Sequence, residues 1–447
     1  MIQLFRVFIP ASTLVLFLIE AIEITASFFL AIFLFLQQDP NDYLLNTFGL
    51  VSIVLVTVSI LAGVYFQNLY SEIRVQSRLL LAQQLLMADG IAFLLQALIS
   101  AAFPDLYMSL RVMLFGCLIA TAAMFVGRLV FSAYILPQVP RERLVLLGDS
   151  PLLADIDNHL AQQTQLGFKV AGHIRRLEPA EASLADEKAP SSPGARLEKL
   201  FETFQSKRIV VGMSGGLDPQ VANELLDLRF LGYSIQDAAA VYAKIFNREG
   251  LSGLGPVQLL YSKEYEPGAR ALFFQAMANW LMAASSLLVL LPVMAIIAAL
   301  LRLGGPVFQR QVRCGRDGIP FTMYSFRLAD NRPSIIDRFL ARTGFYSLPQ
   351  LLNVLRGHMS IVGPRPHRPE FAEKLSRPIP FYPHRFKVRP GMTGWGQIEM
   401  RRRPHLPDCM VELEYDLYYV KYMSATMDIF ILVQAIKNLL LWGGQPL

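Results

Sequence analysis

The chain has 447 residues, of which 53% are hydrophobic and only 17% are charged. So apolar a composition at this length excludes an ordinary soluble protein and indicates segments that cross or enter a membrane. The formal net charge of +6 favours anionic partners. Since an integral membrane protein meets anionic lipid constantly, we expect lipid headgroups and phosphates as partners and no nucleic acid. The three cysteines have no metal-ligand spacing, and the sequence predicts no protein-built metal site.

Four apolar stretches open the chain, each close to or above the ~20 residues that a helix needs to cross the hydrocarbon core. They cover residues 8–36, 48–66, 79–103 and 110–131. Arginines follow the second and the fourth stretch, whereas the connection after the first carries two aspartates and no basic residue. The positive-inside bias therefore predicts a four-helix transmembrane bundle over residues 1–136 with both ends in the cytoplasm.

Three carboxylates fall inside these stretches: Glu20, Glu23 and Asp89. An ionisable residue in a membrane span is a candidate for function by default. Pairing within the bundle is the favoured interpretation for the two glutamates, which lie on one helix face. A transporter would need paired half-helices or inverted repeats, and the sequence shows neither. The role of these residues stays open.

Residues 137–245 alternate short apolar strands with amphipathic helices. Strands are predicted at 144–147, 168–174, 208–212 and 234–237, with helical segments at 151–163, 197–204 and 219–231 and a solvated loop at 178–194. This order indicates a small parallel α/β domain of Rossmann-like topology. The turn Gly148-Asp149-Ser150 has one of the glycines of GxGxxG, so a domain without a bound cofactor is favoured and nucleotide binding stays open. Residues 246–268 are predicted to form a linker.

The last domain, residues 269–447, opens with an apolar run at about 276–301 that Pro292 interrupts. Proline removes a helical hydrogen bond and kinks or breaks a helix. A simple fifth span would place the basic residues that follow outside the cell, whereas a broken helix can enter and leave the same leaflet. We therefore expect a re-entrant helix with its break at Pro292.

Ordered motifs follow this helix. They are GGPVF at 304–308, QVRCGRDG at 311–318, LPQ at 348–350, NVLRG at 353–357, VGPRP at 362–366, VRPGMTGWGQ at 388–397 and DLYYV at 416–420. Together they resemble the bacterial sugar transferase family, the polyprenyl-phosphate phosphoglycosyl transferases. The chain is similar to the large multi-span form, and most of all to the subgroup associated with exopolysaccharide and PEP-CTERM/exosortase loci.

The resemblance implies an α-rich C-terminal domain with a re-entrant membrane helix, in the bacterial inner membrane, with the soluble domains facing the cytoplasm. It also implies a UDP-sugar donor, an undecaprenyl phosphate acceptor and Mg²⁺, with an aspartate that attacks the β-phosphate and releases UMP. Arginine forks suit the phosphates. The candidate phosphate ligands are Arg327, Arg365, Arg385, Lys387 and Arg389; the alternative is that these are surface charges facing headgroups.

The chain departs from the family pattern where the chemistry takes place. The acidic dyad is replaced by Tyr346 and Ser347, and the acidic residue before Met359 by His358, a speculative activating base. Neutral residues also replace charges at Gln275, Asn279 and Ser325. A neutral pair cannot hold Mg²⁺ as carboxylates do, so the metal is doubtful here.

Two functions stay open. One is sugar-1-phosphate transfer that starts an exopolysaccharide repeat unit. The other is a catalytically silent homologue that acts as a scaffold or regulator, as a homo-oligomer or with an active transferase or the polysaccharide assembly and export machinery.

Overall fold

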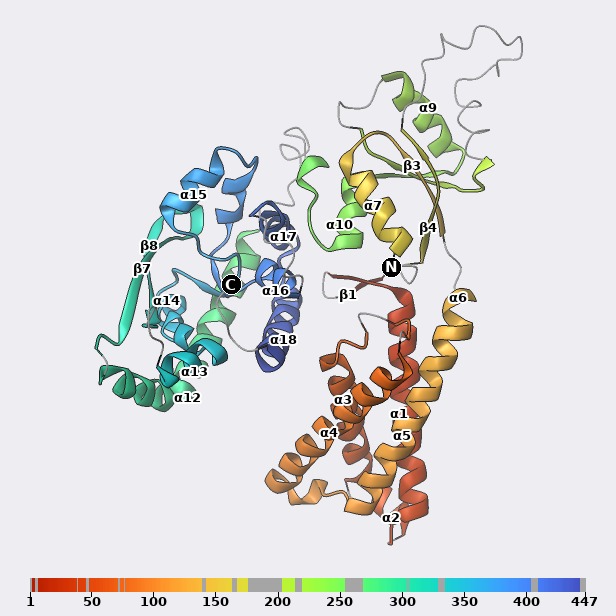
Figure 1. The fold of residues 1–447 in the computed structure, drawn as a ribbon, viewed down its shortest axis with the longest axis vertical. Helices are drawn as coiled ribbons and strands as arrows, with labels where there is room; N and C mark the ends of the chain where they lie inside the picture. The colour runs from red at the N-terminus through yellow and green to blue at the C-terminus, as the bar shows by residue number, and fades with distance from the viewer. Residues whose placement is uncertain are drawn as a thin grey trace. The chain divides into compact units, whose positions relative to one another are not determined.

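The computed structural model describes residues 2–4, 7–37, 39–45, 48–70, 73–75, 77–138, 142–162, 167–175, 203–213, 219–253, 268–303, 305–328, 334–402 and 409–442 (Figure 1). The chain forms two compact units, each described by itself. One comprises Met1–Ile2, Ile9–Arg143 and His159–Val170; the other comprises Gln3–Phe8, Leu144–Asn158 and Ala171–Leu447.

The N-terminal part of the chain is built from apolar helices. They are α1 (Ala11–Phe35), α2 (Pro40–Leu45), α3 (Gly49–Phe66), α4 (Arg78–Ala102), α5 (Leu110–Val130) and α6 (Leu136–Gln138), after a two-stranded sheet of β1 (Ile2–Leu4) and β2 (Val7–Ile9). Serine side chains cap two of the helices: Ser77 Oγ accepts from the amide of Leu80, and Ser109 Oγ from that of Val112. The four predicted apolar stretches are confirmed as helices with ends shifted by at most three residues.

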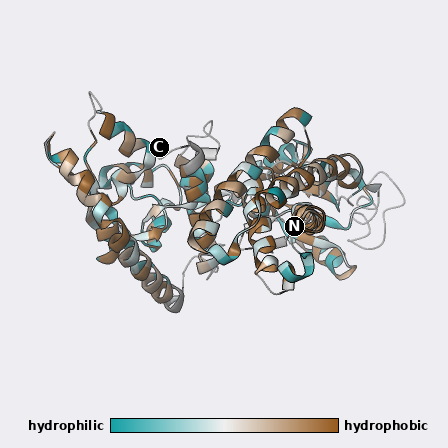
Figure 2. Ribbon diagram, turned by 90° about the horizontal axis from the view of Figure 1, so that it is seen from below, coloured by the Kyte–Doolittle hydropathy of each residue, from teal (hydrophilic) through white to brown (hydrophobic). Residues whose placement is uncertain are grey.

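Helices α1, α3, α4 and α5 share one apolar core that includes Phe28, Val56 and Leu85, all fully buried. Within the described residues, five helices are long and apolar enough to cross a membrane: these four and α12 (Ala269–Arg302). Figure 2 shows hydrophobic residues along most of the length of the long helices. Exposed apolar side chains on such helices need a lipid environment, and the protein is therefore a membrane protein.

The bundle also encloses the predicted carboxylates. Glu20 Oε1 lies 2.5 Å from Nε of Arg128, and the Thr121 hydroxyl donates to Asp89. Pairing inside the bundle is thus confirmed for Glu20. Glu23 differs, because its Oε2 is buried without a hydrogen-bond partner among the described residues.

The α/β region has a four-stranded sheet in the order β4-β3-β5-β6. Its elements are β3 (Glu142–Leu147), α7 (Pro151–Gln162), β4 (Phe168–Ile174), β5 (Arg208–Val211), α9 (Pro219–Phe230), β6 (Ser234–Asp237) and α10 (Ala238–Phe246). Strand β5 pairs in parallel with both β3 and β6, as the alternating pattern predicted. The predicted helix at 197–204 lies largely, and the loop at 178–194 entirely, outside the described residues.

The C-terminal domain is mostly helical, with one hairpin and one short parallel pair. After α12 come β7 (Phe308–Cys314), β8 (Pro320–Phe326), α13 (Ile335–Thr343), α14 (Gln350–Leu355), β9 (Ser360–Val362), α15 (Pro369–Ser376), β10 (Gly391–Thr393), α16 (Trp395–Arg402), α17 (Cys409–Tyr422) and α18 (Ala425–Trp442). Strands β7 and β8 are antiparallel, and β9 pairs with β10 in parallel.

The expected break at Pro292 is absent, because α12 continues through this residue as one helix. It begins seven residues before the predicted apolar run, at Ala269. Its packing is one-sided: Ala283, Met294 and Ile297 are buried against the C-terminal domain, while Leu288 and Val289 are exposed.

Part of the predicted linker is packed rather than free. Arg248 forms an ion pair with Glu414 of α17 at 3.2 Å, and Glu249 forms one with Lys421 of the same helix at 3.1 Å. The Trp395 indole also donates to the carbonyl of Asn247 at 2.9 Å. Residues 247–249 are therefore held by α16 and α17.

Candidate active site

The positions of the missing acidic dyad lie in a 3₁₀ turn at Phe345–Ser347. Helix α13 leads to it. This helix starts with a capping box, in which Ser334 Oγ accepts from the Asp337 amide and Asp337 accepts from the Ser334 amide, and it ends at Gly344 with φ +72°. A left-handed residue at this point favours glycine and turns the chain sharply into the 3₁₀ turn.

Neither residue at the dyad positions carries a carboxylate. Ser347 Oγ donates to the carbonyl of Gly344 at 2.8 Å, which closes the turn locally. Tyr346 is half-buried and packs against the apolar cluster of Met294, Ile297 and Leu301 from α12. The Ser347 hydroxyl is thus engaged within its own turn, and the Tyr346 side chain contributes to the apolar packing of α12.

His358, the speculative activating base, lies after α14 and is exposed. Its ring centroid is 5.8 Å from that of Phe321 in β8. Activation of Ser347 by this imidazole is unsupported by the geometry, because the Ser347 hydroxyl donates to the carbonyl of Gly344.

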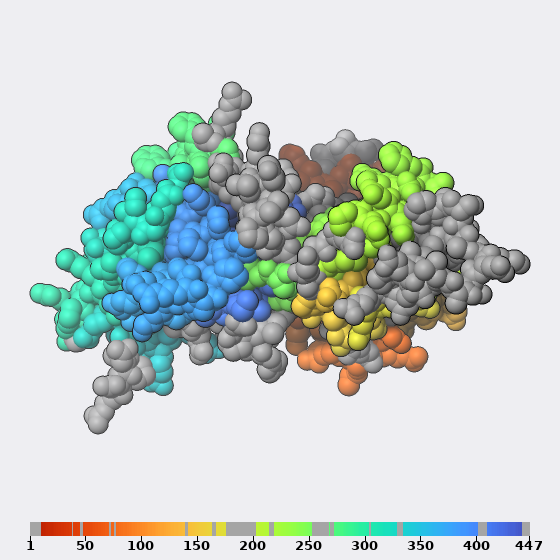
Figure 3. Space-filling model, turned by 90° about the horizontal axis from the view of Figure 1, so that it is seen from above, coloured from red at the N-terminus to blue at the C-terminus, as the bar shows by residue number. Residues whose placement is uncertain are grey.

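Positive charge is concentrated where β7 meets the segment that follows β9. Arg313 Nη1 donates to the carbonyl of Pro366 at 3.2 Å, and its Nε is buried without a partner among the described residues. Burial first, and then the charges of Arg368 and Arg365, lower the pKa of Arg313. These three guanidiniums therefore repel one another, and an anion placed among them would relieve the repulsion. In Figure 3 the two segments lie on one face, with the teal of β7 and β8 beside the blue of residues after β9.

Arg316 and Arg389 lie on two neighbouring loops. Burial and the charge of Arg316 lower the pKa of Arg389. Arg327 lies beside Gly305, because a Cβ built on Gly305 would be 3.4 Å from Nη1 of Arg327. Gly305 has φ +127°, a conformation that favours glycine. Lys387 is exposed at the end of the 3₁₀ turn Tyr382–Lys387.

Arg385 stands apart from the other predicted phosphate ligands. Its side chain is 1% exposed, with Nη2 at 2.6 Å from Asp416 and 3.1 Å from Glu412. Nη1 donates to Nδ1 of His367 at 2.9 Å. Burial lowers the pKa of His367, which fits a neutral ring that donates from Nε2 to Glu412. Since Arg385 already holds two carboxylates, its geometry supports an internal structural role.

Two of the neutral replacements, Gln275 and Asn279, form hydrogen bonds with other parts of the C-terminal domain. Gln275 Nε2 donates to Oδ2 of Asp428 at 2.9 Å and lies 2.8 Å from the Tyr419 hydroxyl. Asn279 Oδ1 accepts from the amide of Ile361 at 2.8 Å. Amides thus attach the first part of α12 to α18 and β9 without any ion pair.

The donor set does not fit the Mg²⁺ that the resemblance implies. This ion prefers carboxylate oxygens, and the dyad positions offer only hydroxyls, one of which is bonded to Gly344. Over the described residues, no three His, Cys, Asp or Glu side chains are grouped so that they could hold a metal. No chemical step proposed below passes through a metal.

Sequence reasoning overlooked two parts of this site. Arg313, Arg316 and Arg368 lie inside or next to the matched motifs but were not selected as ligands. The network of His367, Glu412 and Asp416 was also missed. Three acidic or titratable residues inside apolar motif segments were the available signal, because charges rarely stay buried unless they are paired.

The fold and the site define a membrane protein whose C-terminal domain gathers arginines around a possible anion site. A family model described as bacterial sugar transferase matches residues 270–441. The exopolysaccharide production protein PSS of Rhizobium leguminosarum is 37% identical over 185 residues, which are 36% of this chain and 91% of that protein. The chain belongs to the bacterial sugar transferase family.

Other relatives are longer than the matched segment. The UDP-glucose:undecaprenyl-phosphate glucose-1-phosphate transferase of Escherichia coli is 31% identical over 292 residues, which cover 60% of this chain and 61% of that protein. The UDP-N-acetylgalactosamine-undecaprenyl-phosphate N-acetylgalactosaminephosphotransferase of Aeromonas hydrophila is 33% identical over 170 residues, 34% of this chain and 40% of that protein. The matches thus span less than two thirds of these two relatives.

Proposed function

We propose that this protein transfers a sugar-1-phosphate from a UDP-sugar to undecaprenyl phosphate, the first step in assembly of an exopolysaccharide repeat unit. The names of the relatives support the reaction class. The single observation that carries it is the position of Arg313, whose Nη1 bonds the Pro366 carbonyl, whose Nε lacks a partner among the described residues, and which the charges of Arg365 and Arg368 repel. A diphosphate placed among these arginines would receive charge-assisted hydrogen bonds and neutralise their repulsion.

The missing carboxylates favour a direct displacement over a covalent enzyme intermediate. An oxygen of the lipid phosphate is itself an anionic nucleophile and needs no activating base. It would form a bond to the β-phosphorus while the bond from that phosphorus to the bridging oxygen breaks, and UMP would leave with the bonding electrons. Arginines that hold the phosphoryl oxygens would stabilise the charge that develops on them. The resulting lipid diphosphate sugar contains every atom of the transferred group.

The packing of α12 supports a re-entrant helix over a fifth span. A straight helix of 34 residues would be about 51 Å long, so only one end of a spanning helix could reach a domain on one side of the bilayer. Here Gln275 near one end bonds Asp428, while Leu301 at the other end packs with Phe326 and Leu340. Both ends thus contact the same domain.

The basic residues support one orientation of the N-terminal helices in the membrane. Arg74, Arg78 and Arg128 lie at one end of the N-terminal helices, where α3 ends, α4 begins and α5 ends. We propose a four-helix transmembrane bundle in the bacterial inner membrane, with this end and the soluble domains in the cytoplasm. Reporter fusions after residues 46, 103 and 268 test it: only the first two are expected outside, and an external position 268 would contradict the topology.

A second candidate function is a non-catalytic scaffold or regulator. The specific observation is the dyad, where Ser347 is bonded within its own turn and Tyr346 packs on α12. Such a protein would keep the substrate-binding arginines and act as a homo-oligomer, on an active transferase or on the polysaccharide assembly machinery.

The test is UMP release from a panel of UDP-sugars by the full-length protein in detergent, with and without undecaprenyl phosphate, and with and without a chelator. Release that requires the lipid, and that Arg365→Ala abolishes, supports direct transfer and contradicts the scaffold. Release without the lipid would mean a covalent intermediate and overturn the direct displacement. No release with any donor, by a protein that still binds UDP-sugar, overturns the transferase and favours the scaffold. A folded Tyr346→Asp/Ser347→Glu variant that gains release would show that only the dyad has been lost.

A further inference from the structure

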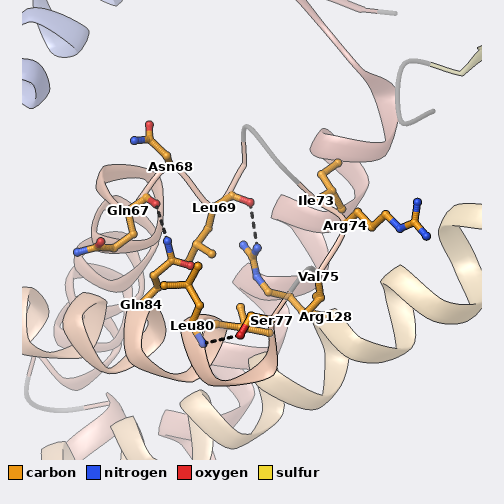
Figure 4. Close-up of a pocket in the computed structure, with 11 residues that line it drawn as sticks. Gln67, Asn68, Leu69, Ile73, Arg74, Val75, Ser77, Leu80, Gln84 and Arg128 are labelled. Atoms are coloured by element: carbon orange, nitrogen blue, oxygen red, sulfur yellow. Dashed lines mark hydrogen bonds between the residues drawn. The ribbon is translucent and has the colours of Figure 1, made fainter. Parts of the chain in front are cut away.

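The N-terminal helices enclose a cavity that the transferase reaction does not use. It lies between the end of α3 and the start of α4, with Arg128 from α5 on one side (Figure 4). Its volume is about 210 Å³, far above the ~15 Å³ that one water molecule needs. Its lining combines apolar side chains with six polar or basic residues: Gln67, Asn68, Arg74, Ser77, Gln84 and Arg128.

Arg128 supplies a donor that lacks an acceptor. The residue is 2% exposed; its Nε pairs with Glu20 at 2.5 Å and its Nη1 donates to the carbonyl of Leu69 at 3.0 Å. Its Nη2 is buried without a hydrogen-bond partner among the described residues. A buried donor without a partner costs roughly 1–3 kcal/mol, and more when it is charged. A ligand that offers an oxygen to Nη2 would recover that free energy.

The start of α4 adds a second feature that favours an anion. Ser77 is the N-cap of this 25-residue helix, and Ser77, Leu80 and Leu81 line the cavity. The Leu80 amide is bonded to Ser77 Oγ and the Leu81 amide to the Ser77 carbonyl, so the helix start contributes the positive end of its dipole and not free N–H groups. Among the described lining residues there is no carboxylate, and Glu20, which pairs with Arg128, is not part of the lining.

The position of the cavity along α1 and α5 indicates which kind of anion it would bind. Helix α1 starts nine residues before Glu20, and the helical segment that contains Arg128 continues to Gln138, so both helices extend about two and a half turns beyond the cavity. Ile73, which lines it, packs with Leu16 and Phe131 on those extensions. The site thus lies where an apolar helix surface meets a basic end, as a lipid headgroup requires.

We propose that this cavity binds the phosphate group of an anionic membrane lipid, with Nη2 of Arg128 as the donor and the positive end of α4 beside it. The site is separate from the arginines of the C-terminal domain and independent of whether the protein is an active transferase. A bound headgroup would fix the connection between α3 and α4.

Native mass spectrometry of the full-length protein in detergent tests the proposal, with dioleoyl-phosphatidylglycerol as the probe and dioleoylglycerol, which lacks the phosphate, as the control lipid. Arg128→Lys keeps the charge that Glu20 needs but has a single nitrogen, so it loses Nη2 together with the Nη1 bond to the Leu69 carbonyl. Arg111→Lys makes the same change near the start of α5, at the other end of the helix. We expect the wild type and Arg111→Lys to retain one phosphatidylglycerol and no dioleoylglycerol, and Arg128→Lys to bind it at least fivefold more weakly.

Gln84→Leu provides a second variant, because it removes an amide from the wall and leaves the ion pair with Glu20 intact. We expect at least threefold weaker binding and an unchanged circular dichroism spectrum. Equal retention of phosphatidylglycerol by both variants and the wild type would overturn the proposal. If inorganic phosphate at millimolar concentration binds and is lost in Arg128→Lys while phosphatidylglycerol is not retained, the site takes a free anion and the lipid assignment is overturned.

Discussion

Nη2 of Arg385 lies 2.6 Å from Oδ2 of Asp416, and both side chains are almost fully buried. Taking two charges from water is unfavourable, and their attraction offsets this only where hydrogen bonds satisfy the remaining polar atoms. Here Nη1 and Nη2 of Arg385 donate to His367, Tyr382 and Glu412, while its Nε has no hydrogen-bond partner among the described residues. The network ties the 3₁₀ turn Tyr382–Lys387 to α17 and thereby positions the adjoining Arg389.

Arg385→Ala should destabilise the C-terminal domain by about 3–5 kcal/mol, because it leaves two carboxylates buried without their cation. Arg377→Ala is the matched control: this arginine pairs with Glu373 at 3.0 Å, but the two side chains are 81% and 72% exposed. An exposed pair contributes about 0–1 kcal/mol. Thermal unfolding in detergent, followed by tryptophan fluorescence, measures the difference. Equal melting temperatures would show that the buried network adds nothing.

Asp428 predicts a dependence of stability on pH. Burial raises its pKa to about 6, against the hydrogen bonds from Gln275 and Tyr419 that lower it. Between about pH 4 and 6 the folded protein holds a proton that the unfolded chain has released, so stability falls as the pH rises. Burial also raises the pKa of Glu414 to about 7, which acts in the same direction.

Asp428→Asn should therefore flatten the fall in melting temperature between pH 5 and 7.5 without removing it. At pH 7 the variant should be more stable by up to ~3 kcal/mol, the value of two pKa units. Glu373→Gln, a change at an exposed carboxylate, serves as the control. A variant whose melting temperature follows the wild-type profile would rule out Asp428 as the titrating group.

Arg313→Gln should weaken the binding of a UDP-sugar roughly 10- to 100-fold, since a hydrogen bond to a charged group contributes about 1.5–3 kcal/mol. Arg310→Gln, three residues earlier on the same strand, removes an exposed guanidinium that lies 5.9 Å over the Tyr324 ring, and should change affinity less than threefold. Isothermal titration calorimetry on the full-length protein compares the two. Losses of equal size would mean that general positive charge, and not this cluster, attracts the donor.

Tyr346→Phe/Ser347→Ala should leave the rate of lipid-dependent UMP release within about threefold of the wild type. The direct displacement uses the lipid phosphate as its nucleophile, so neither hydroxyl takes part in bond formation. The initial rate at saturating undecaprenyl phosphate is the measurement. A loss of a hundredfold or more would make one of these hydroxyls the nucleophile and contradict the direct displacement.

Local sequence alone was sufficient for most of the secondary structure. Long apolar runs give α1, α3, α4 and α5, because a helix satisfies its own backbone in lipid whatever surrounds it. The alternation of short strands with helical segments predicted β4 and β6 with the observed bounds. The ordered motifs of residues 304–420 indicated the family, and they also showed the substitutions at Tyr346 and Ser347 without the structure.

Tertiary structure decided what those residues touch. Arg385 pairs with carboxylates of α17, whereas Arg313 lies near other cations. The sequence could not distinguish these environments, because both residues are arginines in motif segments. Nor could it place Arg128 and the start of α4 in the lining of one cavity, or find that both ends of α12 meet one domain. The physical reason is that burial and charge pairing depend on residues distant in the chain, whereas helix and strand formation depend on near neighbours.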